Sequence, residues 1–325
     1  MKKAIFTLLF IFLLFLPSCS DGRRSTQYFT YFDTVVTLDG YFDSEEEFKK
    51  ASEIVESTLS EYDAIFDIYT HGELKELNKK RSTDISLKLA NAIAFGIKAE
   101  KVTNGYCNIA MGSVLSLWHE AREADTHYLP DALSLNEASK HTDISEISFS
   151  SAGKESVNLT LTDDKMSFDM GAIAKGIVSD VLRERLVDAG FDNLFVNLGG
   201  NVMVIGDKDG NGWGVGVQNP YGDGIVEVIS VSDACLVTSG SYQRYFEYDG
   251  KKYHHIISPD TLYPSELYKS VTVLYKDGAW ADALSTALFN MSIEEGKKVL
   301  GEFQDIGVMW ITADNEYIYY GTLKK

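Results

Sequence analysis

Positive charge is scarce in this sequence. Its 325 residues include 30 Lys and Arg against 48 Asp and Glu, which gives a formal net charge of −18. This imbalance argues against a nucleic-acid partner, because binding a phosphate backbone requires a basic surface. A phosphate-bearing ligand would have to be held by a metal ion, backbone N–H groups and a few local cations.

Cysteine is also rare, with three residues in the chain. No Cys/His cluster has the spacing of a zinc site. Cys107 and Cys235 lie in mainly apolar stretches, so we expect two buried thiols. A disulfide between them is the alternative if the protein lies outside the cytoplasm.

Long apolar runs are missing except for Ala4–Leu16, which follows Lys2 and Lys3. This run is too short to span a bilayer comfortably and is typical of a secretory signal peptide. The next residues complete Leu16-Pro17-Ser18-Cys19, which resembles a bacterial lipobox.

The lipobox predicts how the chain begins. We expect residues 1–18 to be a lipoprotein signal peptide and Cys19 to carry the lipid. Residues 19–29, which are polar, would then tether the protein to the extracytoplasmic (periplasmic) face of a bacterial cell membrane. An ordinary cleaved signal peptide is the alternative.

From residue 30 onward the patterns predict more strands than helices. Strands are expected at 30–41, 145–150, 157–161, 194–204, 213–218, 225–231, 234–238, 245–248, 252–257 and 271–275, with two more near the C-terminus. Helices are expected at 44–66, 86–103, 172–189, 281–290 and 293–300. Strands joined mostly by hairpins, with separate helices, indicate an α+β domain over residues 30–325 with mainly antiparallel sheets.

Asp282 and Thr286 are four residues apart in a predicted helix, so they share one helical face. Their oxygens can converge on a hard cation such as Mg²⁺. The alternative is structural, with Asp as an N-cap and Thr in the core. Upstream, His254 and His255 follow one another on a predicted strand, where a histidine could act as a general base. The structural alternative is one surface histidine and one packed histidine.

Five short motifs occur in a fixed order. They are Asp169–Gly176 (DMGAIAKG), Asn197–Asn201 (NLGGN), Thr238–Tyr242 (TSGSY), His255–Pro259 (HIISP) and Asp282–Thr286 (DALST). Together they resemble the ApbE family of lipoproteins, the FAD:protein FMN transferases. The resemblance covers essentially the whole mature chain.

The resemblance implies an ApbE-like fold with two subdomains around a flavin-binding cleft. It also implies Mg²⁺-dependent transfer of FMN from FAD to a Thr or Ser hydroxyl of an extracytoplasmic acceptor protein, with release of AMP. Two other outcomes stay open on the same fold. One is an FAD pyrophosphatase that gives FMN and AMP, and the other is a flavin-binding or trafficking lipoprotein with little turnover.

The resemblance also implies roles for single residues. The metal ligands would be Asp282, Thr286, the neighbouring Ser285 and the backbone carbonyl of Ala172. His255, rather than His254, would be the general base that takes the proton of the acceptor hydroxyl. Ala172 has a structural alternative, as a small residue that allows close packing.

On the flavin side, Phe32 and Tyr69 would pack on the isoalloxazine ring. The remaining matches are Tyr106, Cys107 and Asn108 as a segment lining the flavin, Asp169 as a hydrogen-bond acceptor, Lys175 near the phosphates or ribose, and Ile256 contacting the substrate through its backbone. The structural alternatives are an N-cap of the 172–189 helix for Asp169 and a solvated helix position for Lys175.

The chain departs from the family pattern at four places. Phe32-Asp33-Thr34 stands where Met-Gly-Thr is usual, and Asn108 and Ser258 stand where Asp is usual. Thr261-Leu262 replaces a Thr-Gly turn. These departures bear on flavin affinity and acceptor choice, whereas the metal motif is intact.

Overall fold

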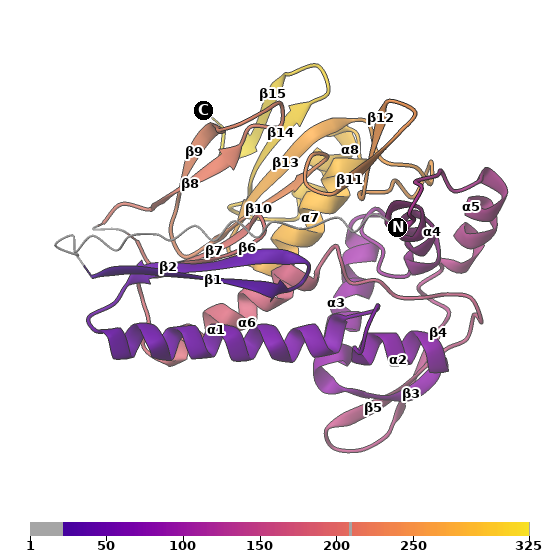
Figure 1. The fold of residues 1–325 in the computed structure, drawn as a ribbon, viewed down its shortest axis with the longest axis horizontal. Coiled ribbons are helices and arrows are strands. Elements are labelled where there is room, and N and C mark those ends of the chain that lie inside the picture. The colour runs from indigo at the N-terminus through magenta and orange to yellow at the C-terminus, as the bar shows by residue number, and fades with distance from the viewer. Residues whose placement is uncertain (1–21, 208–209, 325) are drawn as a thin grey trace, which may run out of the picture.

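The computed structural model describes residues 22–207 and 210–324, and its centre is an eight-stranded antiparallel sheet (Figure 1). The strands lie in the order β1-β2-β6-β7-β10-β13-β14-β15. Their bounds are β1 Arg23–Tyr31, β2 Thr34–Tyr41, β6 Leu194–Leu198, β7 Asn201–Ile205, β10 Cys235–Gly240, β13 Tyr268–Tyr275, β14 Gly307–Thr312 and β15 Tyr317–Gly321.

Helices cover one face of this sheet, as Figure 1 shows. They are α1 Glu45–Phe66, α6 Ala174–Asp188 and α7 Gly278–Asn290, with α8 Ile293–Leu300 following α7. Helices α6 and α7 approach closely at Gly176, where a β-carbon would lie 2.3 Å from the carbonyl oxygen of Gly278. This contact needs glycine, and it brings the start of α6 against the first turns of α7.

A two-stranded hairpin covers the other face. It consists of β8 Trp213–Gln218 and β9 Ile225–Val231. Trp213 and Val231 pack there with Val204 and Leu236 of the large sheet in a second, smaller core. Burial of apolar side chains on both sides therefore fixes the central sheet.

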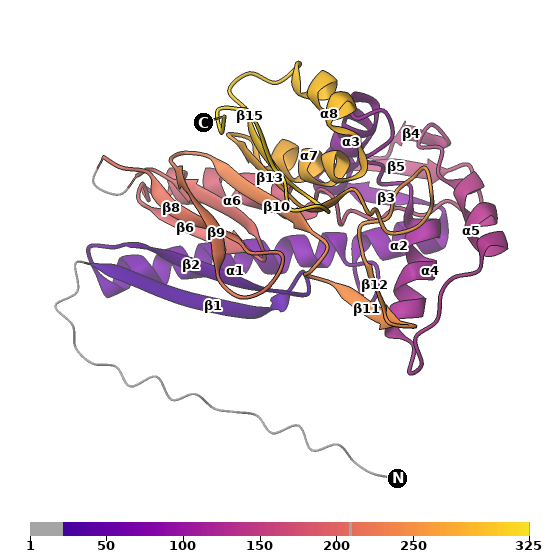
Figure 2. The same cartoon turned by 90° about the horizontal axis from the view of Figure 1, so that it is seen from above.

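The remaining elements gather at one end of the molecule (Figure 2). A small sheet has the order β3-β5-β4, with β3 Ser82–Ser86, β4 Ile147–Ser151 and β5 Ser156–Leu161. The helices there are α2 Glu73–Lys80, α3 Leu87–Val102, α4 Gly112–Glu123, α5 Ala132–Ala138 and a 3-10 turn at Ser139–His141.

The hairpin of β11 Tyr245–Tyr248 and β12 Lys251–His254 packs on this group through aromatic rings. The ring of Trp118 on α4 lies 6.0 Å from that of Tyr253 and 6.4 Å from that of Phe246, centroid to centroid. Strand β12 is thereby held against α4. The strand predicted at 252–257 ends at His254, so His255 lies just beyond it.

Several sequence predictions are confirmed. The fold is α+β with antiparallel sheets. Helix α1 begins after Ser44, whose hydroxyl accepts the N–H of Glu47 at 3.1 Å. Cys107 and Cys235 are both free, buried thiols. None of the helices in the described part of the chain is long and apolar enough to cross a membrane.

The N-terminal prediction is partly wrong. Residues 23–29, expected in the tether, belong to β1, so the domain begins before residue 30. Because β1 is an edge strand whose alternate side chains face solvent, its polar composition resembles a linker. The predicted strand 30–41 is a hairpin that turns at Phe32 and Asp33, and β3 was not predicted. The signal peptide and Cys19 lie outside the described residues.

Candidate active site

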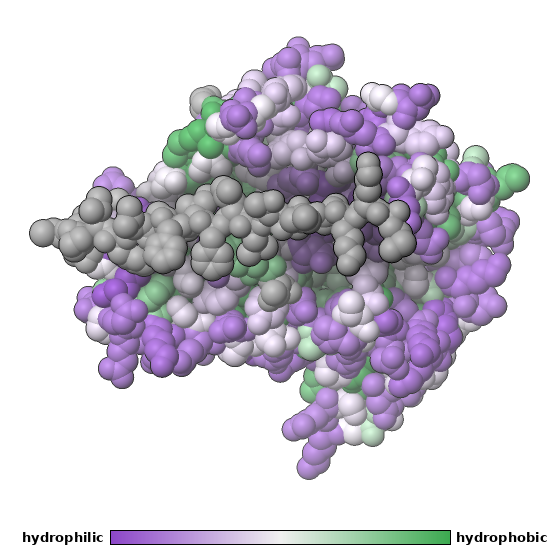
Figure 3. Space-filling view, viewed as in Figure 1, coloured by the Kyte–Doolittle hydropathy of each residue, from purple (hydrophilic) through white to green (hydrophobic). Residues whose placement is uncertain are grey.

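A cavity of about 990 Å³ brings the predicted site residues together. Its walls come from the β1–β2 turn, the loop after α1, α4, the loop before α6, the segment after β10, and α7. All the predicted flavin, metal and catalytic residues line it except Ser285. The hollow at the centre of the face in Figure 3 is hydrophilic, in keeping with a site for a polar ligand.

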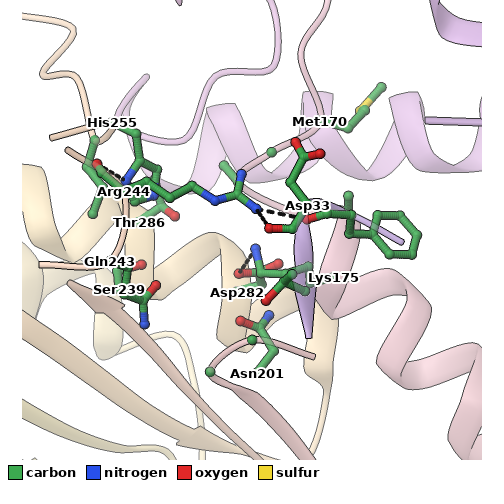
Figure 4. A pocket seen from close by; sticks show the side chains of 18 of the residues that line it. Asp33, Met170, Lys175, Asn201, Ser239, Gln243, Arg244, His255, Asp282 and Thr286 are labelled. Carbon is green, nitrogen blue, oxygen red and sulfur yellow. Dashed lines mark hydrogen bonds and ion pairs between the residues drawn. The ribbon is translucent and has the colours of Figure 1, made fainter. Parts of the chain in front are cut away.

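Asp282 is a buried carboxylate at the base of this cavity (Figure 4). Its Oδ2 accepts the N–H of Gly176 at 2.9 Å, and its Oδ1 lies 3.9 Å from Nζ of Lys175. Burial raises the pKa of Asp282, and Lys175 and Asn201 oppose that rise. The side-chain amide of Asn201 therefore lies beside this carboxylate, where both are buried.

The oxygen atoms around Asp282 suit a hard cation. Because the N–H of Gly176 points to Asp282, the carbonyl of Ala172 accepts no hydrogen bond from the described residues. The hydroxyl of Thr286 also lines the cavity. A carboxylate, a hydroxyl and a backbone carbonyl are oxygen donors of the kind Mg²⁺ prefers. The described residues contain no cluster of three or more His, Cys, Asp or Glu able to hold a metal.

Ser285 differs from the other predicted ligands. Its side chain is fully buried and donates to the carbonyl of Asp282 at 2.9 Å. Its oxygen also lies 2.8 Å from the hydroxyl oxygen of Ser239. Ser285 thus links α7 to β10, and its geometry gives it a structural role.

His255 and His254 face different surroundings, as predicted. His255 lines the cavity, whereas His254 is buried beside Phe289. Nε2 of His254 lies 2.8 Å from the carbonyl oxygen of Ser265, and its Nδ1 accepts the N–H of Ile256 at 3.2 Å. These bonds place a proton on Nε2 of His254 and leave it no free lone pair.

His255 is arranged as a base. Nδ1 of His255 lies 3.2 Å from the carbonyl oxygen of Arg244, which can only accept, so Nδ1 carries the proton and Nε2 carries the free lone pair. Burial, and then the positive charge of Arg244, lower the pKa of His255 to about 3. The imidazole is therefore neutral near pH 7 and can accept a proton.

Arg244 was not predicted, although it lines the cavity. Its guanidinium Nη2 donates to the carbonyl oxygens of Phe32 at 2.8 Å and Asp33 at 3.0 Å. Phe32 also donates its N–H to Oδ1 of Asp63 at 3.2 Å. The position of Phe32, a predicted flavin contact, thus depends on two residues from distant parts of the sequence, Asp63 and Arg244.

Tyr69 presents an aromatic platform in the cavity. The ring of His119, another residue that was not predicted, stacks on it with centroids 4.1 Å apart and 22° between the planes. Nη2 of Arg122 donates to Nδ1 of His119 at 2.9 Å, and burial lowers the pKa of His119, so this imidazole is neutral. Burial raises the pKa of Tyr69 to about 12. Two flat, uncharged rings suit a flavin ring.

The segment 106–108 is held mainly by its own hydrogen bonds. The hydroxyl of Tyr106 donates to Asp260 at 2.8 Å, and this bond raises the pKa of Tyr106 to about 12. Cys107 is buried. Asn108 donates to the carbonyl of Thr142 at 2.9 Å and accepts the N–H of Ala110 at 2.8 Å. The amide of Asn108 therefore shapes the cavity wall.

The structure also shows the contacts of two further predicted site residues, Asp169 and Ile256. Oδ1 of Asp169 accepts the N–H of Gly171 at 2.7 Å, and burial raises the pKa of Asp169. Asp169 does not cap α6, whose N-cap is Ile173, so that structural alternative is wrong. Ile256 lines the cavity, but its N–H donates to His254 and its carbonyl accepts the N–H of Ser265 at 3.1 Å. The backbone N–H of Ile256 is therefore not free to make the expected contact with a substrate.

Known proteins are similar to this chain in sequence and in fold. Residues 32–310 match the model of the ApbE family. The chain is 32% identical over 224 residues to an FAD:protein FMN transferase of Klebsiella pneumoniae, covering 68% of this chain and 67% of that protein. It is 35% identical over 230 residues to one of Treponema pallidum, covering 66% and 63%.

Solved structures of ApbE proteins have a similar fold. An ApbE protein of Thermotoga maritima superposes with a TM-score of 0.82 at 26% identity, over 91% of this chain and 96% of that one. The flavin transferase ApbE of Vibrio cholerae superposes with a TM-score of 0.77 at 25% identity, over 92% and 98%. The match over most of the sequence and the shared fold lead to one conclusion: the chain belongs to the ApbE family.

Proposed function

We propose that the chain is an FAD:protein FMN transferase that acts with Mg²⁺ on a Thr or Ser hydroxyl of an acceptor protein. One observation carries the proposal: a single cavity joins a buried carboxylate with free oxygen donors, a neutral histidine with an open Nε2, and an aromatic platform. The two curated relatives above carry the name FAD:protein FMN transferase.

The metal would be held by Asp282, Thr286 and the carbonyl of Ala172. When bound, Mg²⁺ would neutralise charge on the pyrophosphate and on the departing AMP. Lys175, 3.9 Å from Asp282, adds a positive charge at the same place.

The protein's own residues then account for the transfer. Nε2 of His255 takes the proton of the acceptor hydroxyl, whose oxygen forms a bond to the phosphorus of the FMN phosphate. The bond between that phosphorus and the bridging oxygen breaks, and AMP leaves with the bridging oxygen. Tyr69, His119 and Phe32 hold the flavin ring, so that its phosphate lies between the metal ligands and His255.

The second candidate keeps the same cavity and changes the nucleophile. If water reaches Nε2 of His255 in place of a protein hydroxyl, the products are FMN and AMP. A carrier with little turnover would use the binding surfaces alone. We propose the lipid-anchored, extracytoplasmic location with the transferase activity, on the strength of Leu16–Cys19 alone.

One experiment separates the three outcomes. The full protein is mixed with FAD and Mg²⁺, with and without a folded acceptor domain that bears an exposed Thr. Flavin covalently attached to the acceptor supports transfer. Free FMN and AMP without an acceptor support hydrolysis, and unchanged bound FAD supports a carrier.

A further inference from the structure

Arg244 connects two parts of the cavity that come from opposite ends of the sequence. Its main-chain carbonyl receives Nδ1–H of His255 at 3.2 Å and the backbone N–H of His255 at 3.1 Å. Its guanidinium reaches the carbonyls of Phe32 and Asp33, as Figure 4 shows for Asp33. One residue thus touches both the general base and the β1–β2 turn.

That turn has an unfavourable backbone conformation. Phe32 and Asp33 have φ values of +53° and +50°, in the left-handed region that side chains other than glycine rarely adopt. The pairing of Tyr31 with Thr34 closes this two-residue hairpin turn, but Phe32-Asp33 lacks the glycine that such turns favour, so contacts from outside can stabilise it. The described side-chain contacts of that kind are the two bonds from Arg244 and the bond from Phe32 to Asp63.

We propose that Arg244 is a positioning residue, which holds the Phe32–Asp33 turn in its left-handed conformation and so sets the flavin-side wall of the cavity relative to His255. The inference rests on the proposed function for the identity of the ligand. The hydrogen bonds between Arg244 and the turn are present in the protein without a ligand, so their effect on its melting temperature can be measured separately.

Substitutions of Arg244 affect only part of this arrangement. Because the carbonyl that orients His255 belongs to the main chain, Arg244→Ala keeps that bond and removes both bonds to the turn. The loss of two hydrogen bonds from a charged donor should weaken FAD binding about 10-fold. The KM for FAD should rise more than kcat falls, because His255 keeps its tautomer. Arg244→Lys keeps the charge with a single donor group and should restore part of the affinity.

The decisive test is a double-mutant cycle with Asp33→Gly. Glycine adopts a positive φ without strain, so the turn then needs less support from Arg244. In the Asp33→Gly background, Arg244→Ala should weaken FAD binding by about 3-fold or less. The melting temperature of the protein without ligand should show the same pattern, with a smaller drop in the glycine background.

Two controls make the cycle specific. Asp33→Ala removes the same carboxylate and keeps the β-carbon, so the full effect of Arg244→Ala should persist there. Lys252→Ala removes an exposed cation on the adjacent β12 that does not line the cavity, and it should bind FAD as the unchanged protein does.

The proposal is overturned if Arg244→Ala weakens FAD binding by the same factor in the native and Asp33→Gly backgrounds. That result would mean that Arg244 contacts the ligand directly. Unchanged FAD affinity and melting temperature in Arg244→Ala would also overturn it. If the native protein transfers no FMN, the proposed function fails, and the melting-temperature cycle still decides the role of Arg244.

Discussion

Replacing Asp282 with Asn should separate activity from stability. In the native protein Oδ2 of Asp282 accepts the N–H of Gly176 at 2.9 Å. Asn keeps an oxygen that can accept this N–H, but it removes the negative charge. Without that charge the proposed metal loses its one anionic protein ligand. Lewis-acid assistance contributes several kcal/mol to such reactions, so transfer should fall by about 10³-fold.

The stability of the protein without ligand should change in the opposite direction. Burial raises the pKa of Asp282 above that of an unfolded chain, so folding with an ionised Asp282 carries a cost that a neutral side chain avoids. Asn removes this unfavourable charge and fills nearly the same volume. The melting temperature at pH 7 should therefore stay the same or rise in the mutant.

The assay compares Asp282→Asn with Asp277→Asn, a control on the same helix. Asp277 is the N-cap of α7, accepts the N–H of Trp280 at 2.9 Å and does not line the cavity. Asn caps a helix as well as Asp does, so this control should keep both activity and stability. Native transfer rates with Mg²⁺ in Asp282→Asn, or a large fall in its melting temperature, would refute the reasoning.

Five more predictions concern the base and its pH dependence, its neighbour, the helix contact and the anchor. His255→Ala should lower transfer about 10²–10⁴-fold with little change in FAD binding, and equal transfer in the mutant would exclude general-base catalysis by this residue. Because protonation disables the base and the pKa of His255 is about 3, the acid limb of kcat/KM should lie well below the ordinary imidazole value of about 6.5; a limb at 6.5 would contradict this environment. His254→Ala should affect transfer far less than His255→Ala but should lower the melting temperature, since His254 bonds Ser265 and Ile256 inside the protein. Gly176→Ala should destabilise the protein and impair activity, because its β-carbon would lie 2.3 Å from a backbone oxygen of α7; unaltered melting would show that the helices can separate. Cys19→Ser should leave the protein unprocessed or soluble on membrane fractionation, and unchanged membrane association would contradict lipidation at that residue.

The parts of the fold and site that were predicted correctly depend on short-range patterns. Ser44 caps α1 because its hydroxyl and the N–H it binds are three residues apart. Asp282 and Thr286 line one cavity because a spacing of four places them on one helical face. The alternation expected along a strand separated His254 from His255 correctly, although β12 ends at His254 and His255 follows it. Such relations are encoded within a few residues, and a sequence shows them directly.

The parts that were missed depend on contacts between distant residues. Arg244 acts on a turn more than 200 positions away, and His119 matters because α4 brings it onto Tyr69. No local pattern distinguishes Arg244 from a solvated arginine. Ser285 shows the reverse case, since it lies in the metal motif yet its buried hydroxyl bonds Ser239 on β10. Only the packing of α7 on the sheet reveals that Ser285 does not line the cavity.

The charges that line the cavity bear on the proposed role of a divalent cation. Five carboxylates line it in the described chain, those of Asp33, Asp63, Asp67, Asp169 and Asp282, against the three cations of Arg122, Lys175 and Arg244. The histidines there for which burial lowers the pKa, His119 and His255, add no positive charge near pH 7. A pyrophosphate entering this cavity brings about two further negative charges, so binding should be weak without a divalent cation. FAD titrated into the protein in excess chelator should therefore bind at least about 10-fold more weakly than in Mg²⁺. Affinity that is equal in chelator and in Mg²⁺ would mean that the aromatic platform of Tyr69 and His119 holds FAD by itself, and that the oxygen donors around Asp282 serve the reaction and not the binding.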